Sequence, residues 1–232
     1  MLHPRNELAK SQRANRGNTA KLVKGNLVNA EGEEIEVKTA LDIDRILAKY
    51  DTKYDRGYKM HFTSNHDENS WAGTEMARMG DGHKAFAVLC ATFDGMPLIY
   101  SGQESAMDKQ LEFFKKDNIE WGEYEYMDFY KTLLELKHRN QALWNGEYGG
   151  DLVKIATGND ENVYAFMREK NGDKVVVLIN LSAEAQGFKL QGDHFVGNYE
   201  DVFVNQEIGP TALTANMGMS LQPWGYGVWS NK

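Results

Sequence analysis

The stretch "FTSNHDEN" (62–69) carries side chains that could act on a substrate, and it follows an apolar run, "YKMHF" (58–62). His66 and Asp67 stand side by side, with asparagines on both sides. An aspartate where a strand ends could be a general acid or base, a nucleophile, a metal ligand or a carboxylate that binds sugar hydroxyls. A neighbouring histidine could donate a hydrogen bond to a hydroxyl. Asn, Asp and Ser are equally common as helix N-caps, so both interpretations stay open on spacing alone.

The elements that would position these residues alternate between helix and strand. In chain order, the patterns predict a helix over 39–50, a strand over 58–63, a helix over 81–93, a strand over 96–102 and a helix over 125–143. Strands separated by helices indicate a parallel sheet with crossover connections. Active residues of such folds lie at the carboxyl ends of the strands. "SNHDEN" and "SGQE", each of which follows a strand, are therefore expected at one edge.

Local signals mark the ends of two of these helices. Thr39 and Asp42 have the spacing of a capping box. Asp81 is expected to cap the helix over 81–93, and Gly95 is expected to stop it. This helix is apolar almost all round and is preceded by a glycine-containing loop. We therefore expect it to be buried and to need cover from other elements.

The sequence changes character after residue 145. Short runs rich in β-branched and aromatic residues are broken by turn residues at regular intervals, which is typical of an antiparallel sandwich or barrel. Asn171-Gly172 predicts a tight hairpin. The predicted boundary lies near "WNGEYGG" (144–150). The expected organisation is an α/β part over 1–145 and an all-β part over 146–232.

Composition excludes several classes of protein. The chain has 232 residues, 41% of them hydrophobic, and a net charge of −8, as expected of a globular protein. An acidic chain without a basic stripe does not suit nucleic acid. No apolar run approaches the roughly 18 residues that a membrane span needs, so no membrane association is expected. The single cysteine, Cys90, rules out an internal disulfide and is expected to be a buried thiol.

The order of the motifs resembles the C-terminal part of glycoside hydrolase family 13, the α-amylase family. "FTSNHDEN" resembles the motif at the end of barrel strand seven, and "GMPLIYSGQE" (95–104) resembles strand eight and its loop. The tail that ends in "LQPWGYGVW" (221–229) resembles the C-terminal β-sandwich. The resemblance covers about residues 55 to 232. It implies a partial (β/α)8 barrel segment, about strands seven and eight with flanking helices, over 1–145, and an antiparallel β-sandwich over 146–232.

The resemblance also implies roles for four residues. Asp67 would be the third catalytic carboxylate, which binds hydroxyls of the distorted sugar and stabilises the oxocarbenium-like transition state. His66 would hydrogen-bond the same sugar, and Asn65 would help to shape the loop. Glu104, in "SGQE", would lie on the catalytic rim and support the site rather than react.

The other half of such a site is not found in this sequence. A retaining glycosidase needs a nucleophile and a general acid about 5–5.5 Å apart, and in the family these follow strands four and five. Nothing in residues 1–57 matches either motif. A closed barrel also takes about 250 residues. We therefore expect a C-terminal fragment of a larger α-amylase-like enzyme. This fragment would be inactive alone and would have open strand edges through which copies could associate.

The expected partner of the parent enzyme is an α-glucan such as starch or maltodextrin. The alternative is a non-catalytic glucan-binding protein or a structural remnant. In that case sugar would be bound by aromatic residues of 113–130, or by Trp224 and Tyr226, although core packing is the preferred interpretation for Trp224 and Trp229. In either case, Trp71 and the aromatic residues of 113–130 could stack on sugar faces. No cofactor or metal is expected in this chain. Calcium is common in the family, but its ligands would lie in missing segments. The sequence leaves open which glycosidic linkage the parent enzyme cleaves and in which compartment it acts. It also leaves open whether the reaction is hydrolysis, transglycosylation or isomerisation.

Overall fold

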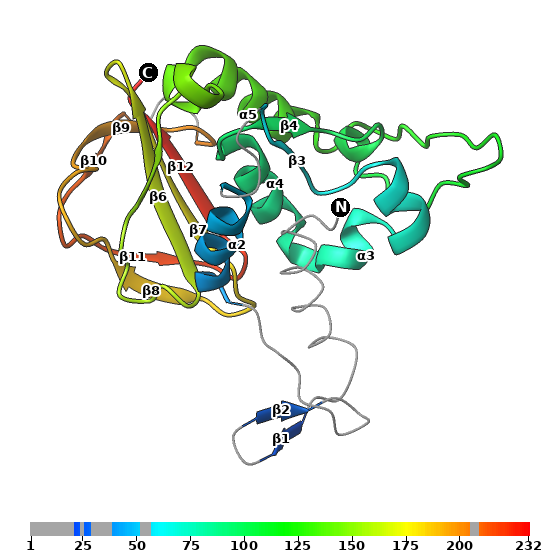
Figure 1. Cartoon of the computed structure of the whole chain (residues 1–232), viewed down its shortest axis with the longest axis horizontal. Coiled ribbons are helices and arrows are strands. Elements are labelled where there is room, and N and C mark those ends of the chain that lie inside the picture. The colour runs from blue at the N-terminus through cyan, green and yellow to red at the C-terminus, as the bar shows by residue number, and fades with distance from the viewer. Residues whose placement is uncertain (1–20, 24–25, 29–38, 52–56, 205–208) are drawn as a thin grey trace.

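The computed structural model describes residues 21–23, 26–28, 39–51, 57–204 and 209–232 (Figure 1). Segments 1–20 and 29–38 of the predicted α/β part lie outside the described residues. The described elements before residue 151 are β1 (Lys21–Val23), β2 (Asn26–Val28), α2 (Leu41–Asp51), β3 (Met60–Phe62), α3 (Glu75–Met79), α4 (His83–Thr92), β4 (Met96–Leu98) and α5 (Met127–Arg139). Short π or 3-10 turns cover Glu68–Ala72, Gly80–Gly82, Gln103–Ser105, Gln141–Leu143 and Gly146–Tyr148.

β3 and β4 form the parallel pair that the alternation of helix and strand predicted. Met60 pairs with Met96, and Phe62 pairs with Leu98. Each strand has three residues, so both are shorter than the predicted ranges. α3 and α4 make the crossover between them. The carboxyl ends of the two strands therefore lie side by side, and the segments that follow them leave from the same edge.

The C-terminal half is an antiparallel β structure, as predicted. β5 (Leu152–Lys154), β6 (Val163–Lys170), β7 (Asp173–Asn180), β9 (Gly197–Asp201), β10 (Thr211–Leu213) and β12 (Tyr226–Ser230) form a six-stranded sheet in the order β10-β9-β12-β7-β6-β5. β8 (Gln186–Lys189) and β11 (Gly218–Leu221) form a separate antiparallel pair. The connection between β6 and β7 is the predicted hairpin. Asn171 and Gly172 have φ of 52° and 89°, and Lys170 pairs with Asp173, as in a type I′ turn.

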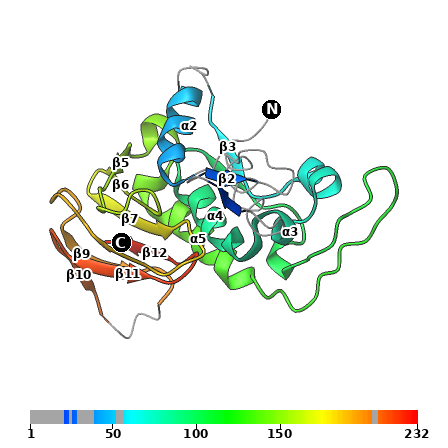
Figure 2. The same ribbon diagram turned by 90° about the horizontal axis from the view of Figure 1, so that it is seen from below.

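In the large sheet, the central strands β6 and β7 are buried on both faces, and helices α2 and α4 lie beside one of these faces (Figure 2). Successive side chains of a strand point to opposite faces. Tyr164 and Phe166 of β6 accordingly lie in one hydrophobic cluster, and Ala165 lies in a second cluster on the other face. Helices α2 and α4 cover the first face, and the β8–β11 pair covers the second. Burial on both faces explains why "VVVLI" in β7 is continuously apolar.

The cover that the apolar helix α4 needs comes from the C-terminal sheet of the same chain. Residues 85–92 are buried. Phe86 and Leu89 share a cluster with Tyr164 and Val177 of the sheet. Trp224 belongs to the same cluster with 7% of its surface exposed, and Trp229, 6% exposed, packs in the second. Core packing of both tryptophans is therefore confirmed.

Two predicted helix ends are wrong. α4 begins at His83, because Gly80–Gly82 forms a 3-10 turn that contains the expected cap, Asp81. The helix ends at Thr92, before the extended residue Phe93. Gly95 lies farther on with φ of 136°, where a Cβ atom would come 2.4 Å from the carbonyl oxygen of Lys59. Gly95 therefore permits the close approach of the two strands rather than the end of the helix.

Two further local features concern the helix starts. The backbone N–H of Thr39 donates to the Asp42 carboxylate at 2.8 Å, which is one arm of the predicted capping box of α2. The segment expected to be a loop before α4 is largely helical. Thr74 caps α3 there, and its hydroxyl oxygen accepts a hydrogen bond from the N–H of Ala77 at 3.1 Å.

Arg168 joins the two halves of the chain. It lies in β6, its side chain is fully buried, and it donates hydrogen bonds to four backbone carbonyl groups. The acceptors are Thr92 at the end of α4 and Leu143, Trp144 and Gly150 in the connection between the halves, at 2.8 to 3.3 Å. The predicted boundary near 144–150 is thus the segment that this side chain fixes against the sheet.

Candidate active site

His66 and Asp67 lie on a helical turn that begins four residues after β3 ends. Both side chains face solvent, with 68% and 62% of their surface exposed. The His66 Nε2 and Asp67 Oδ1 atoms are 3.5 Å apart. The pair therefore offers a carboxylate and an imidazole together at the carboxyl edge of the parallel strands, open to a ligand.

Asn65 has the capping role that the sequence left open for this stretch. Its side-chain oxygen accepts a hydrogen bond from the N–H of Glu68 at 2.7 Å, and its carbonyl oxygen accepts one from the N–H of Asn69 at 2.9 Å. Asn65 therefore begins the turn. Because the cap is provided by Asn65, the side chains of His66 and Asp67 are not needed for it.

A buried arginine holds this turn against the strand. Arg78 of α3 is 2% exposed and donates to the carbonyl oxygens of Thr63 and Gly73. Its guanidinium also lies 3.2 Å from the carboxylate of Glu68. One side chain thus joins the end of β3, the turn with His66 and Asp67, and α3. An arginine suits this position because its guanidinium offers five N–H donors in a fixed plane and can bond several acceptors at once.

The loop after β4 is connected to the same region by Gln103. Its amide nitrogen lies 2.6 Å from the carboxylate of Glu75, 2.8 Å from the hydroxyl of Thr63 and 3.1 Å from that of Tyr130. Its amide oxygen accepts from the N–H of Tyr100 at 2.6 Å. Burial raises the pKa of the Glu75 carboxyl above its usual value, and burial also raises the pKa of Tyr130 well above its usual value.

Glu104 makes two hydrogen bonds in the region that follows β4. Its carboxylate accepts a hydrogen bond from the N–H of Gly102 at 2.9 Å, and its carbonyl oxygen accepts one from the N–H of Tyr126 at 3.0 Å. These bonds fold the loop after β4 back on itself. The neighbouring Gln103 is the buried residue of the pair, with 6% of its surface exposed.

Aromatic rings extend from the His66–Asp67 pair over the adjacent surface. The imidazole of His66 stacks on Phe113 with ring centres 6.1 Å apart. Phe113 in turn lies 5.2 Å from Trp71 and 4.9 Å from Phe114. Trp71 and Phe114 are 63% and 82% exposed, and Phe113 is 41% exposed. We call Trp71, Phe113 and Phe114 the aromatic platform.

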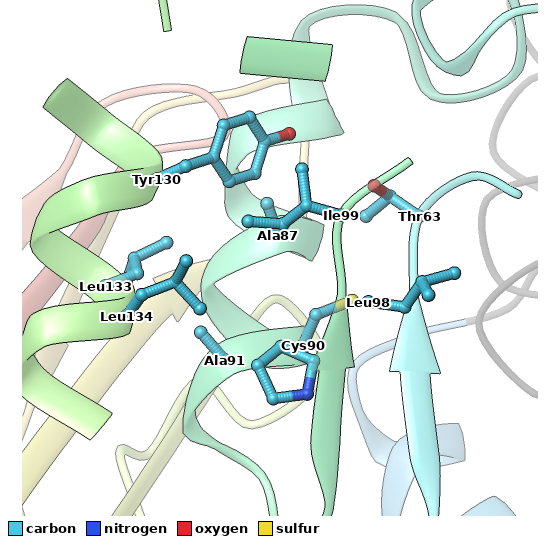
Figure 3. A pocket seen from close by; sticks show the side chains of 10 residues that line it. Thr63, Ala87, Cys90, Ala91, Leu98, Ile99, Tyr130, Leu133 and Leu134 are labelled. Carbon is cyan, nitrogen blue, oxygen red and sulfur yellow. The ribbon is translucent and has the colours of Figure 1, made fainter. Parts of the chain in front are cut away.

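Two cavities among the described residues lie away from the aromatic platform. A small apolar cavity opens between α4, α5 and the ends of β3 and β4, with Cys90, Leu133 and Leu134 among its lining residues (Figure 3). Its volume of about 10 Å³ is close to the space of one water molecule, too small for a sugar. Cys90 is buried in its wall, as predicted.

A wider groove of about 700 Å³ crosses the outside of the β8–β11 pair and is lined by Gly187, Lys189, Gly218 and Ser220 among others. The aromatic residue in its lining, Phe188, is only 7% exposed, because it packs in the core. The groove therefore offers little ring surface to a sugar.

The described part of the chain has neither a membrane-spanning helix nor a cluster of metal-ligating side chains. None of its helices combines the length and apolar character needed to cross a membrane. Among the same residues, no three His, Cys, Asp or Glu side chains come together as a metal site would require.

The residues that position the site were not predicted. The sequence drew attention to Glu104, but the buried connections are made by its neighbour Gln103 and by Glu75 and Arg78. These contacts join positions 10 to 40 residues apart. The sequence offered one signal for two of these residues. Glu75 and Arg78 are charged and stand shortly before an apolar helix, and a charged side chain that is buried there needs a partner.

Comparison with known proteins identifies the relatives of this chain. Residues 154–228 match the family model described as the maltogenic amylase C-terminal domain. An α-amylase 2 from Dictyoglomus thermophilum is 24% identical over 180 residues, which are 69% of this chain and 29% of that protein. A cyclomaltodextrinase from Thermoanaerobacter pseudethanolicus is 30% identical over 99 residues, 41% of this chain and 16% of that protein.

The chain is a partial relative of glycoside hydrolase family 13, the α-amylase family. The fold agrees with this relationship. The crystal structure of a noncanonic maltogenic α-amylase from Thermotoga neapolitana matches 83% of this chain and 46% of that chain, with a TM-score of 0.65 at 18% identity. A cyclomaltodextrin glucanotransferase matches 97% of this chain and 43% of its own, with a TM-score of 0.63 at 17% identity. The chain thus spans less than a third of these curated relatives and less than half of these structures.

Proposed function

We propose that this chain is the C-terminal part of an α-amylase-family glycosidase that acts on α-glucans. The finer fold assignment belongs to the same proposal: β3 and β4 correspond to barrel strands seven and eight, and the β-rich half corresponds to the C-terminal β-sandwich. One observation carries the proposal. His66 and Asp67 stand exposed and adjacent at the carboxyl edge of a parallel strand pair, while Asn65, Arg78 and Gln103 hold the surrounding backbone.

The chemistry of the pair suits glycoside cleavage. An oxocarbenium-like transition state carries positive charge on the sugar ring, and a fixed carboxylate beside it lowers its free energy. Asp67 would accept hydrogen bonds from ring hydroxyls and supply this negative charge. His66 would donate a hydrogen bond to the same sugar. Both roles require exposed side chains on an ordered backbone, which is the arrangement seen here.

Hydrolysis needs two further carboxylates in this proposal. A nucleophile and a general acid would come from a polypeptide segment that supplies other barrel strands, because residues 1–57 contain no matching motif. The 232-residue chain alone would then bind α-glucan weakly and not cleave it. The names of the relatives, α-amylase and cyclomaltodextrinase, support a starch-type substrate.

Binding of maltoheptaose to the purified chain tests the proposed substrate. Asp67→Asn and His66→Ala are expected to weaken binding, measured by isothermal titration calorimetry. Asp193→Asn is the matched control, because Asp193 is an exposed aspartate in the β-rich half. If Asp67→Asn and Asp193→Asn have the same small effect, the assignment of Asp67 is wrong.

The exposed aromatic platform favours a second candidate, a protein that binds α-glucans without cleaving them. Both candidate functions involve binding of an α-glucan, but only the first includes its cleavage. Reconstitution with the remaining barrel strands distinguishes them, since hydrolysis would appear only if the site is catalytic.

A further inference from the structure

We infer that the aromatic platform is a separate stacking subsite of this α-glucan site. Trp71, Phe113 and Phe114 would hold a glucose ring next to the ring contacted by His66 and Asp67. The inference rests on the proposed function and adds a sugar-binding position that neither Asp67 nor His66 provides. It is carried by the continuity of the rings, their exposure and the way the loop beneath them is fixed.

The rings form one continuous surface with the site. The His66 imidazole and the Phe113 ring are stacked at 25°, and Phe113 contacts both other rings of the platform. Trp71 and Phe114 also contact each other, with centres 5.9 Å apart. A chain of sugar rings that leaves Asp67 and passes His66 therefore meets Phe113 first, and then the two most exposed rings.

The backbone under the platform is fixed by a buried amide. Asn69 is 3% exposed; its side chain donates to the carbonyl oxygen of Lys109 at 3.0 Å and accepts from the N–H of Leu111 at 2.8 Å. Gln110 donates to the carbonyl oxygen of Ser70 at 2.5 Å. These bonds tie the loop after β4 to the turn after β3. The exposed rings therefore stand on an ordered support, which reduces the entropy lost on binding.

A sugar is the occupant that this surface suits best. Sugar rings present apolar C–H faces to aromatic rings and hydroxyls to the polar groups around them. Gln110, Glu112 and Lys115 are exposed beside the platform and offer amide, carboxylate and ammonium groups. Another exposed pair of rings, Trp121 and Tyr124, stacks with ring centres 6.0 Å apart and is not part of the series of ring contacts that begins at His66.

The test measures, in the 232-residue chain, the separate contributions of the aromatic platform and of the His66–Asp67 pair to sugar binding. Maltotriose, maltoheptaose and cellohexaose are titrated while tryptophan emission and heat are recorded. Phe114→Ala and Trp71→Ala are the platform variants, and Trp71→Phe keeps a ring at the site. Tyr148→Ala is the matched control, because Tyr148 is 57% exposed on a different segment. Thermal melts confirm that each variant folds.

We expect Phe114→Ala and Trp71→Ala to weaken maltoheptaose binding about three- to tenfold, as the loss of one ring contact implies. The same two variants should weaken the binding of maltotriose less. Trp71→Phe and Tyr148→Ala should change maltoheptaose binding little. Cellohexaose should not compete with maltoheptaose. The subsite is refuted if the platform variants bind maltoheptaose like the unmodified chain while His66→Ala weakens binding. That result would leave the proposed function intact. If no α-glucan binds at all, both fail. If emission changes with protein concentration instead of sugar, a second copy covers the platform, and the subsite is again refuted.

Discussion

The amide nitrogen of Gln103 lies 2.6 Å from the carboxylate of Glu75. This contact joins the loop after β4 to the helix that follows β3, so it holds together the two segments from which the candidate site projects. Because Glu75 is buried, its carboxylate loses hydration on folding, and the contact with Gln103 compensates only part of that loss. The support of the site is therefore sensitive to the charge of Glu75.

Glu75→Gln is expected to change how stability depends on pH. Burial raises the pKa of Glu75 above 4.5 in the folded chain. The folded state thus binds the proton more tightly than the unfolded state. This contribution is complete below pH 4.5 and is lost as pH rises through the folded pKa. Glutamine mimics the neutral acid, so the variant should gain stability relative to the unmodified chain as the pH rises above 4.5 and through the raised pKa of Glu75. Urea unfolding at several pH values measures the difference.

The control for this experiment is Glu123→Gln, since Glu123 is exposed. Because substitutions at exposed positions usually change stability by about 0.5 kcal/mol or less, only a small effect is expected for this control. A stability difference for Glu75→Gln that does not change with pH would show that Glu75 does not titrate as proposed.

Arg168→Leu is expected to lower the free energy of unfolding, because Arg168 connects the two halves of the molecule. The substitution removes the Arg168 donor from the carbonyl groups of Thr92, Trp144 and Gly150, while the carbonyl of Leu143 still accepts a hydrogen bond from Lys137 at 2.6 Å. Each unsatisfied group costs about 1–3 kcal/mol, so a total loss of at least about 3 kcal/mol is expected after relaxation. Arg168→Lys keeps the charge with fewer donors and should lose less. Chemical unfolding followed by tryptophan emission measures both, and equal stability of all three proteins would contradict the role of Arg168.

Gly172→Ala tests the hairpin between β6 and β7. Gly172 has φ of 89°, and nothing lies within 4 Å of an added Cβ, so the cost is purely conformational. We expect a loss of about 1 kcal/mol. Gly187→Ala is the control, because Gly187 also has open space at its Cβ and does not have positive φ. Similar melting temperatures for the two variants would mean that the turn does not require glycine.

Local signals explain which parts of the fold could be predicted from the sequence. Asn171-Gly172 predicted its hairpin because the two residues alone favour positive φ. The positions of β3 and β4 followed from short apolar runs between helices. The start of α4 was missed, because Asp81 is a good cap by type but lies inside a 3-10 turn. Local propensity cannot distinguish these outcomes when two glycines surround the residue.

The motif of the candidate site could be predicted from the sequence, but the residues that position this motif could not. His66, Asp67 and Asn65 stand in one short stretch, so their juxtaposition follows from the sequence itself. Arg78 and Gln103 act through contacts with distant backbone and side-chain groups, which only the folded chain brings together. For the same reason, the sequence showed that α4 needs cover but did not show that Phe166 and Val177 provide it.

Reconstituted hydrolysis tests the central claim most directly. The chain is combined with a polypeptide that carries the N-terminal barrel strands of an α-amylase-family enzyme, and the release of reducing ends from maltoheptaose is measured. The account predicts activity only in the mixture, and a loss of about a thousandfold or more when Asp67→Asn replaces the unmodified chain, as is common for catalytic carboxylates. An active mixture whose rate is unchanged by Asp67→Asn would contradict it.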